Sequence, residues 1–258
     1  MPLERYDTIG IGYGRVRVPD PRIAALIEEA LGDAVSVVNV GAGAGSYESP
    51  HRKVVGVEPS AEMIRQRAPD AAPCILGRSE ALPFVDGAVD ACTAFWTVHH
   101  WSDQAAGLRE MRRVARRRVL LMNYLPGAIP PEARWLSGIY FPHIARVDET
   151  LFPRLAACEA SLGPCRVVPV LLPADCRDGF LDAYWSRPEA YLEERVRAGI
   201  SGFRLMPEAE RTAGLEKLAR DLASGAWDER FAHLRTEASF DAGVRLVIAE
   251  QGVTPRRG

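Results

Sequence analysis

Short apolar runs that stop at turn residues recur along the chain, and amphipathic helical stripes separate many of them. The runs have the length of strands, whereas the stripes place apolar residues three and four positions apart. Strands that alternate with helices in this way are typical of a parallel sheet covered by helices on both faces. We therefore predict an α/β fold with a doubly wound, seven-stranded, mostly parallel sheet. The predicted strands cover residues 35–40, 54–57, 73–76, 89–95, 119–124, 167–172 and 243–249.

Capping residues mark the predicted helix starts between these strands. Asp20 precedes a proline at the first helical position, and the apolar stripe that follows ends near Gly32. Ser60 can cap a helix after the second strand, and Ser102 with Asp103 can cap one after the fourth strand. The helices thus connect successive strands of one sheet.

The chain is expected to form one domain over residues 1–258. An apolar stripe also predicts a helix over residues 149–162. The stretch after the sixth strand has helical spacing and aromatic residues but no strand signal, so we interpret it as a helical cap inserted before the last strand. The expected parts are an N-terminal flap at 1–19, a cofactor-binding core at 20–125, substrate-cap insertions at 126–146 and about 177–235, and the last strand at 243–250.

Charge and composition restrict the classes of partner. The chain has 258 residues, of which 47% are hydrophobic, enough to bury one sizeable core. Its 32 basic and 34 acidic residues give a formal charge of −2, a poor match for a protein that must neutralise a phosphate backbone. The densest basic run, six arginines in 109–118, is explained by a helix end and a solvated face. We expect no nucleic-acid partner.

Cysteine and apolar patterns favour a reducing compartment. The five cysteines form no CxxC pair and suggest neither a disulfide framework nor a zinc site. No apolar run approaches the ~18 residues of a membrane span, and the first residues do not resemble a signal peptide. We therefore expect a cytoplasmic protein with no membrane partner and no metal.

A glycine cluster between the first two strands is the strongest candidate for a binding site. It has the form GxGxG at Gly41, Gly43 and Gly45, and the second strand ends at the carboxylate of Glu58. Glycines let a ligand approach the backbone closely, and an acid at this place can hold both hydroxyls of a ribose. The turn therefore predicts a nucleotide-like ligand across the strand ends.

Spacing separates the candidate nucleotides. A P-loop requires a lysine after the glycines, and none is present. A dinucleotide site requires GxGxxG, but here the third glycine comes one residue early and Ser46 takes its place. ATP or GTP hydrolysis is therefore disfavoured, and a nicotinamide cofactor is weakened but stays open.

The GxGxG turn with an acid-tipped second strand resembles class I S-adenosylmethionine-dependent methyltransferases, in particular their small-molecule, type 11-like branch. Residues 77–84, followed by Asp86 and Asp90, resemble the family's third-strand motif running into its fourth strand. Residues 97–103, TVHHWSD, resemble the segment after the fourth strand. The resemblance covers about residues 35–124 and implies a Rossmann-like fold with S-adenosylmethionine as cofactor.

The resemblance also implies roles for individual residues. The glycine turn would line the methionine portion, Glu58 would hold the ribose, and the end of the fourth strand would flank the donor near its methyl group. The same side chains also fit ordinary core packing, an alternative that stays open for Met63, Phe95 and Trp96. The implied cofactor-binding residues are Gly41, Ala42, Gly43, Glu58, Pro59, Met63, Ser79, Glu80, Ala81, Phe95 and Trp96.

Two residues depart from the family pattern. Asn39 ends the first strand where the family usually has an acid, so the contact with the methionine ammonium differs from the usual one. We still place Asn39 in the cofactor site. Arg78 stands where the family often has an aspartate near the adenine amino group. These departures also keep open a non-catalytic module of the same fold.

Paired histidines after the fourth strand are the candidate general base. Methyl transfer is an in-line displacement that often requires removal of a proton, and His99 and His100 would lie beside the donor. A histidine tuned near neutral pH suits that role. The alternative is that the pair only shapes the loop.

Flanking aromatic and basic residues complete the candidate site. Tyr13 and Arg17 can close over the cofactor, where either one can meet its carboxylate; the alternative, a flexible N-terminal end, stays open. We expect a largely apolar pocket for a small organic acceptor. Trp185 and Tyr191 are equally compatible with the core of the cap. The candidate substrate-binding residues are Trp101, Tyr140, Trp185 and Tyr191.

The sequence therefore predicts a methyltransferase that moves a methyl group from S-adenosylmethionine to an oxygen, nitrogen or carbon of a small, partly apolar metabolite. The absence of an Asn/Asp-Pro-Pro-aromatic tetrad, whose place Thr93-Ala94-Phe95-Trp96 takes, favours a small molecule over DNA. Two alternatives stay open, a nicotinamide-dependent reductase and a non-catalytic cofactor-binding module.

Overall fold

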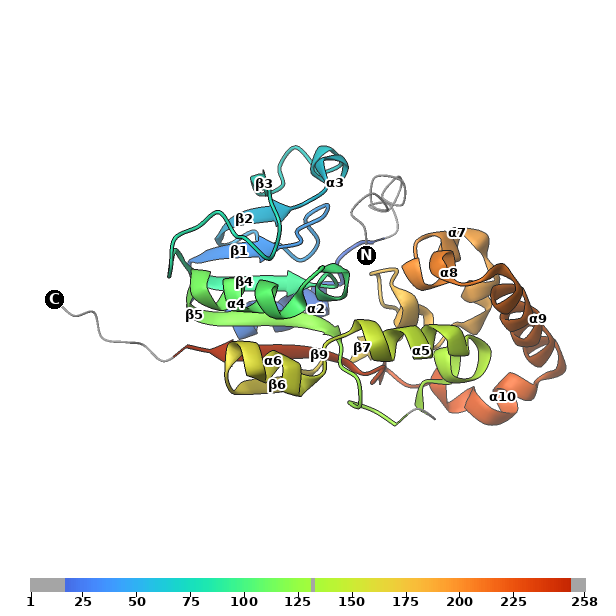
Figure 1. Cartoon of the computed structure of the whole chain (residues 1–258). Helices are drawn as coiled ribbons and strands as arrows, with labels where there is room; N and C mark the ends of the chain where they lie inside the picture. Colours follow the sequence, from blue (N-terminus) through green and yellow to red (C-terminus); the bar gives the residue numbers. More distant parts are fainter. Residues whose placement is uncertain (1–16, 131–132, 252–258) are drawn as a thin grey trace.

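A seven-stranded sheet forms the centre of the computed structural model, which describes residues 17–130 and 133–251 (Figure 1). The strand order is β3-β2-β1-β4-β5-β9-β6, and the first five strands along this order run parallel. Strand β9 is antiparallel to both of its neighbours. The strands are β1 (Ser36–Val40), β2 (Lys53–Glu58), β3 (Cys74–Leu76), β4 (Val89–Phe95), β5 (Ala115–Tyr124), β6 (Cys165–Pro169) and β9 (Val244–Glu250), with β7 (Leu172–Pro173) and β8 (Ser239–Phe240) in a separate two-stranded sheet.

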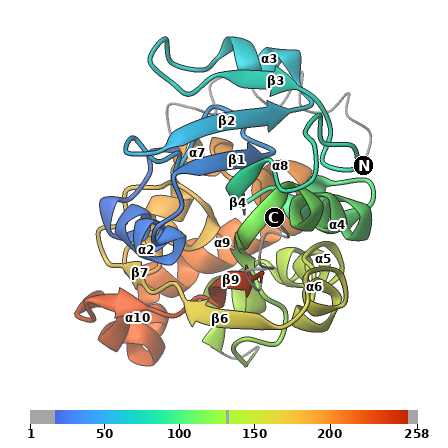
Figure 2. The same ribbon diagram turned by 90° about the vertical axis from the view of Figure 1, so that its left-hand side faces the viewer.

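Helices cover both faces of the large sheet. Figure 2 shows α2 on one side of the sheet and α4 with α6 on the other. The α-helices are α2 (Pro21–Leu31), α3 (Ala61–Arg65), α4 (Gln104–Val114), α5 (Pro142–Leu151), α6 (Leu155–Leu162), α7 (Glu194–Ala198), α8 (Ser201–Leu205), α9 (Glu208–Ser224) and α10 (Ala226–Phe231). Shorter 3₁₀ or π turns are η3 (Val98–His100), η5 (Leu136–Tyr140), η6 (Leu181–Tyr184), η7 (Pro188–Leu192) and η8 (Ala232–Arg235). The predicted doubly wound α/β fold is confirmed.

The first helix begins where its capping residue predicts. The Asp20 carboxylate is fully buried and accepts hydrogen bonds from the backbone N–H groups of Arg22 and Arg177. Burial alone disfavours this carboxylate, but the hydrogen bonds from Arg22 and Arg177 outweigh it and lower the Asp20 pKa to about 2. One side chain therefore caps α2 and attaches it to the segment that enters the cap.

The predicted sixth strand, 167–172, was wrong in its bounds, because β6 spans 165–169 and Leu172 pairs with Phe240 in the separate two-stranded sheet. Two further predicted boundaries were wrong, and both errors have physical causes. Strand β5 begins at Ala115 rather than Val119, because Ala115 already pairs with Val89 of β4. Part of the arginine run therefore lies in a strand, where Arg116 pairs with Asp90 at 2.9 Å. The helix predicted over residues 149–162 is instead two helices, α5 and α6, separated around Pro153, which lacks an N–H to continue the first helix.

Aromatic packing holds together the helical segment between β6 and β9. The rings of Trp135 and Trp227 meet edge to face at 5.4 Å between centroids, and Trp135 meets Tyr191 at 5.9 Å. All three residues are buried. The first predicted insertion, which contains Trp135, and the second, which contains Tyr191 and Trp227, thus share one apolar cluster in the described part of the chain. We therefore describe both as one cap, residues 133–146 and 177–235.

Gly214→Ala tests how tightly α9 packs in the cap. Helix propensity alone favours alanine by about 1 kcal/mol. A Cβ at Gly214, however, would lie 2.4 Å from the Tyr140 carbonyl oxygen and 2.5 Å from the Phe141 ring. Overpacking of this kind costs about 1–3 kcal/mol. Urea unfolding is expected to show a loss of stability for Gly214→Ala and no loss for Thr212→Ala, an exposed position on the same helix. Stabilisation by Gly214→Ala would contradict this packing.

Candidate active site

The glycine turn brings the ends of β1 and β4 into contact. Gly41, Gly43 and Gly45 have φ angles of +71°, +50° and +95°, in the region that favours glycine. A Cβ at Gly41 would lie only 2.0 Å from the Thr97 hydroxyl oxygen. The first glycine is therefore required by the approach of the loop after β4, and this contact narrows the space above the strand ends.

Glu58 ends β2 with both carboxylate oxygens oriented. One oxygen accepts the Gly43 N–H at 2.9 Å, and the other accepts the Ser60 N–H at 3.0 Å. Glu58 is 6% exposed, and its burial raises the pKa although the two N–H groups and Arg67 oppose the rise. A carboxylate oxygen has two lone pairs, so each oxygen can still accept one ligand hydroxyl.

Asn39 contacts a carboxylate that comes from the glycine turn. Its side-chain amide donates to Glu48 Oε1 at 3.2 Å, and its carbonyl oxygen accepts from the Thr93 hydroxyl at 3.4 Å. Glu48 forms a buried ion pair with Arg67 at 2.6 Å, and Arg67 also donates to the Gly43 carbonyl at 3.0 Å. A carboxylate therefore lies beside the end of β1, but it comes from the turn rather than from the strand.

Residues predicted at the adenosine portion lie around α3 and the start of α4. Met63 is buried, and its methyl group would contact a Cβ at Gly43 at 3.5 Å, whereas Pro59 is exposed. Ser79 is buried and Ala81 is exposed.

Glu80 holds the loop before α4. Its Oε1 accepts hydrogen bonds from the Ser102 N–H at 3.0 Å, the Ser102 hydroxyl at 2.7 Å and the Asp103 N–H at 3.2 Å. Desolvation opposes the charge on Glu80, but these hydrogen bonds outweigh it and lower the pKa. Glu80 thus has a structural role that its motif did not indicate.

Trp101, predicted to contact substrate, packs instead against α4. A Cβ at Gly107 would lie 2.5 Å from the Trp101 ring, and the indole N–H donates to the Thr97 hydroxyl at 3.3 Å. The ring also belongs to the apolar cluster on the α4 face of the sheet. Trp101 therefore lies on the side of the strand ends nearer to Ser79 than to the cap.

Phe95 and Trp96 end β4 in different environments. Phe95 is 9% exposed and meets the Tyr47 ring edge to face. Trp96 has φ of +56°, which is unusual for a bulky side chain, and its ring lies between Phe180 at 4.7 Å and Tyr124 at 5.3 Å. Its buried indole nitrogen has no hydrogen-bond partner among the described residues. Strain and an unmet donor at the end of β4 are typical of a functional position.

The rings of His99 and His100 are in contact, tilted at 49° with their centroids 3.7 Å apart, and His99 also meets the Phe152 ring at 4.3 Å. Desolvation, followed by repulsion from His100 and Arg17, lowers the His99 pKa well below its usual value. Desolvation lowers the His100 pKa to about 4. Both imidazoles are therefore neutral at pH 7, but neither has the near-neutral pKa expected from the sequence.

Arg17 is linked to the residues after the glycine turn by the carboxylate of Asp178. Its guanidinium donates to Asp178 at 2.5 and 3.2 Å, and the same carboxylate accepts from the Tyr47 hydroxyl at 2.9 Å. Tyr47 lies two residues after the last glycine and has φ of +60°. The other proposed flap residue, Tyr13, lies outside the described residues.

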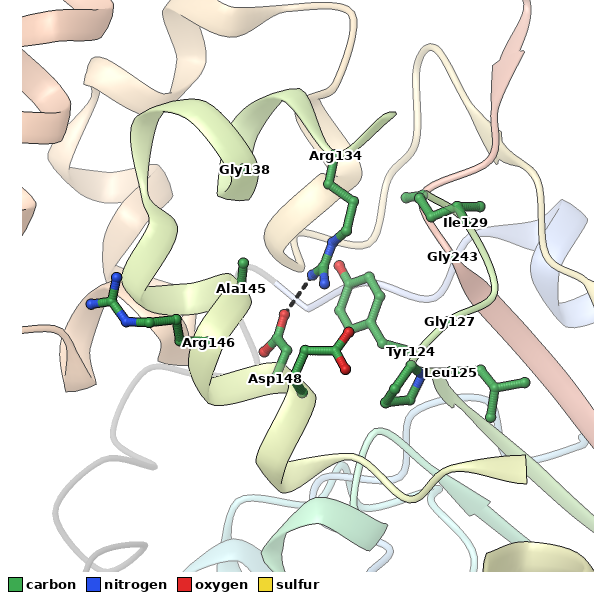
Figure 3. Close-up of a pocket in the computed structure, with 13 residues that line it drawn as sticks. Tyr124, Leu125, Gly127, Ile129, Arg134, Gly138, Ala145, Arg146, Asp148 and Gly243 are labelled. Atoms are coloured by element: carbon green, nitrogen blue, oxygen red, sulfur yellow. Dashed lines mark hydrogen bonds and ion pairs between the residues drawn. The ribbon is translucent and has the colours of Figure 1, made fainter. Parts of the chain in front are cut away.

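A cavity of about 380 Å³ lies beyond the end of β5 (Figure 3). Tyr124 forms part of its wall, and Figure 3 shows Arg134 pointing toward Asp148, with which it pairs at 2.6 Å. Because the Tyr124 ring also meets Trp96, the cavity is connected by direct packing to the end of β4. Its walls come from the end of β5 and the loop after it, η5, α5 and the two residues before β9. The lining residues are Tyr124, Leu125, Pro126, Gly127, Ile129, Arg134, Gly138, Ala145, Arg146, Asp148, Glu149, Ala242 and Gly243.

Three of the predicted substrate residues lie in the core of the cap and do not line this cavity. Trp185 and Tyr191 are fully buried, and their polar atoms donate to carbonyl groups of residues 172, 173 and 181. Tyr140 is 3% exposed and donates its hydroxyl to Asp221 at 2.8 Å. These contacts support the core-packing alternative, because satisfied and buried groups have no free face for a ligand.

Several residues of the site were missed from the sequence. Asp178 and Asp182 lie in the cap, and only the fold brings them near the turn and β5. Arg134 gave no signal of its own. Glu48 lies three residues after the last glycine and could have been identified from the sequence. A carboxylate in the turn can replace the acid that is absent from position 39.

Glu48→Gln is expected to destabilise the glycine turn. The substitution removes the carboxylate that pairs directly with buried Arg67, and breaking such a pair typically costs about 3 kcal/mol. Chemical denaturation of the variant measures this loss. Glu193→Gln, which removes an exposed pair with Arg195, is the matched control and should change stability by less than about 1 kcal/mol. Equal losses of stability in the two variants would show that the buried pair stabilises the fold no more than the exposed pair does.

His100 is expected to titrate far below an ordinary histidine. Proton NMR should give its imidazole a midpoint near 4, with His100→Gln to assign the signal. Because the unfolded chain binds this proton near pH 6.5 and the folded chain does not, the histidine reduces stability as the pH falls from about 6.5 to 4. A midpoint between 6 and 7 would contradict the desolvated position.

Comparison with known proteins agrees with this geometry. Residues 38–122 match the family model described as "Methyltransferase domain". A proposed methyltransferase from an antibiotic biosynthesis pathway of Anabaena variabilis has a crystal structure that superposes with a TM-score of 0.81 and 30% identity, over 91% of this chain and 98% of that one. Demethylmenaquinone methyltransferase of Thermotoga maritima is 29% identical over 53% of this chain and 63% of its own length. Malonyl-[acyl-carrier protein] O-methyltransferase of Erwinia pyrifoliae is 36% identical over 35% of this chain and 37% of its own length.

The matched segment spans less than two thirds of these two sequence relatives, whereas the Anabaena structure is covered almost completely. The family model covers the glycine turn, Glu58 and the end of β4. These are the parts in which the geometry above orients a carboxylate and close-packed glycines for a nucleoside ligand. The chain belongs to the class I S-adenosylmethionine-dependent methyltransferases, a family whose cofactor is S-adenosylmethionine.

Proposed function

We propose that the protein transfers a methyl group from S-adenosylmethionine to an oxygen, nitrogen or carbon of a small, partly apolar molecule. The observation that carries this proposal is the position of Glu58, whose two oxygens are oriented by the Gly43 and Ser60 N–H groups at the glycine turn. This arrangement fits a ribose with two adjacent hydroxyls. The family membership supports the same cofactor.

The proposed cofactor site fits the residues that are present. Gly43 has no side chain and a φ of +50°, and a Cβ there would meet only the Met63 methyl group, so the turn offers a close backbone approach of the kind that a nucleoside requires. The Glu48 carboxylate, held by Asn39 and Arg67, is our candidate for balancing the methionine ammonium in place of an acid at position 39. Arg17 is already paired with Asp178, so its role toward the cofactor carboxylate remains a proposal that requires exchange of partners.

The chain's contribution to the reaction is orientation, exclusion of water and removal of a proton. When bound, S-adenosylmethionine supplies an electrophilic methyl group on a sulfonium. Phe95 and Trp96 at the end of β4 are positioned to hold an acceptor in line and to keep water out, since alignment and desolvation are what such a displacement needs. The neutral imidazoles of His99 and His100 can accept a proton, although their low pKa values make them weak bases.

For the acceptor we propose a chemical class and no individual molecule. The relatives are named for different acceptors, a demethylated quinone and a carrier-bound malonyl group, so neither name is transferred to this chain. The mixed apolar and polar lining of the cavity supports a small organic acceptor and no nucleic acid. None of the described helices is long and apolar enough to cross a bilayer. We retain cytoplasmic localisation and the single-domain division as proposals.

Glu58→Gln tests the cofactor site directly. The substitution removes the charge that would accept two ribose hydroxyls, and hydrogen bonds to charged groups contribute about 1.5–3 kcal/mol. Calorimetry with S-adenosylhomocysteine and S-adenosylmethionine is expected to show binding at least about tenfold weaker than in the unchanged protein. Gly43→Asp should weaken it further, because φ at this position is +50°, which strains any side chain, and the added Cβ would lie 3.5 Å from the Met63 methyl group in the turn.

Glu62→Gln is the control, since Glu62 pairs with Arg65 on the outside of α3. The proposal fails if neither ligand binds the unchanged protein, or if Glu58→Gln binds as tightly as Glu62→Gln. Incubation with methyl-labelled donor and a metabolite extract then separates the enzyme from a non-catalytic module, because only an enzyme transfers the label. A fluorescence change with reduced nicotinamide cofactor would favour a reductase.

A further inference from the structure

Four polar side chains form a largely buried cluster at the wall of the cavity beyond β5: Tyr124 and Asp182 are buried, and Arg134 and Asp148 are half-buried. Tyr124 donates its hydroxyl to Asp182 at 2.5 Å, and Arg134 pairs with Asp148 at 2.6 Å. The Arg134 guanidinium lies over the Tyr124 ring at 5.5 Å from its centroid. Arg134 interacts electrostatically with both carboxylates, so the four groups form one charge network.

The formal charges of this cluster do not balance. Asp182 is a buried carboxylate, the Asp148 side chain is 14% exposed at the cavity, and Arg134 is the cation that faces both of them. One negative charge is therefore left without a counterion when both acids are ionised. A buried charge is costly unless it is paired, so the cluster needs either a proton or a second cation.

Other charged groups at the cavity already have partners. Arg146 pairs with Glu210 at 2.9 Å, and Glu149 pairs with Arg154 at 2.8 Å. These pairs are largely exposed and leave no surplus positive charge for the cluster. The shifts of the acids agree: burial raises the Asp148 pKa to about 6 despite Arg134, and burial raises the Asp182 pKa despite Tyr124 and Arg134.

One further polar atom close to the cluster lacks a partner. The Trp96 indole nitrogen is buried and has no hydrogen-bond partner among the described residues. The Trp96 ring meets the Tyr124 ring, which forms part of the cavity wall. Buried polar atoms are almost always satisfied, so this unmet donor marks the contact between the end of β4 and the cavity wall as unusual.

We propose that this cavity is the acceptor site and that it binds the protonated amine of the acceptor, with Asp148 as the direct partner and Asp182 acting through Tyr124. An ammonium group supplies the missing positive charge and three N–H donors. The aromatic face of Tyr124 also favours a cation. At about 380 Å³ the cavity suits a compact molecule with one ring or a short apolar chain. The identification of the bound molecule as the methyl acceptor rests on the proposed function, whereas the cation site itself does not.

Three probes of one shape test the inference: benzylamine, benzyl alcohol and benzoate. Ligand-observed NMR at pH 7.5 on the full chain, without any methyl donor, measures their affinities. We expect benzylamine to bind at least about tenfold more tightly than benzyl alcohol, as hydrogen bonds to a charged partner imply, and benzoate to bind most weakly. Comparable binding of the amine and the alcohol to the unchanged protein would overturn the inference, and this comparison requires no variant.

Asp148→Asn and Asp182→Asn locate the effect. Each substitution keeps the shape and removes one negative charge, so each should reduce the preference for benzylamine to about threefold or less. Asp86→Asn, at an exposed acid paired with Arg113 far along the chain from the cavity, should preserve it. An undiminished preference in both cavity variants would overturn the inference. S-adenosylhomocysteine binding, measured in the same samples, reports on the proposed function separately, because the two sites use different residues.

Discussion

The buried Asp178 carboxylate is the interaction on which the arrangement of the site depends. It accepts hydrogen bonds from Tyr47, two residues after the last glycine of the turn, and from Arg17, in the segment before α2. Asp178 itself belongs to the start of the cap. Because a buried charge must stay paired, the turn, the N-terminal segment and the cap cannot move apart independently without leaving it exposed or unpaired. One carboxylate thus aligns three parts of the chain over the strand ends.

Two carboxylate systems divide the region above the sheet. Glu58 and Glu48 lie at the β1 and β2 ends and are held by backbone N–H groups, Asn39 and Arg67. Asp148 and Asp182 lie beyond β5 and share Arg134. Trp96, in a strained conformation at the end of β4, lies between these systems through its contact with Tyr124. The separation matches a reaction with a donor on one side and an acceptor on the other.

The histidine pair and the aromatic residues of the cap show where pattern reasoning reached its limit. Position after β4 correctly indicated that His99 and His100 lie near the strand ends, but not that desolvation lowers the pKa of both and that repulsion from His100 and Arg17 lowers the pKa of His99 further. From the sequence, Trp185 and Tyr191 fit a substrate pocket and the core of the cap equally well. The carbonyl groups that accept their hydrogen bonds belong to other segments of the chain, which the local pattern does not identify. Burial and partner choice are tertiary properties.

The sequence by itself determined the α/β fold, the glycine turn, the acid at position 58 and the family resemblance, because each depends on local order: apolar period, turn residues and spacing along one strand. Only the tertiary structure decided that Glu48 lies beside Asn39, that Asp178 joins the turn to the cap, and that one arginine faces two acids beyond β5. These are contacts between residues far apart in the chain or on different elements, and their charge balance exists only when the fold brings them together.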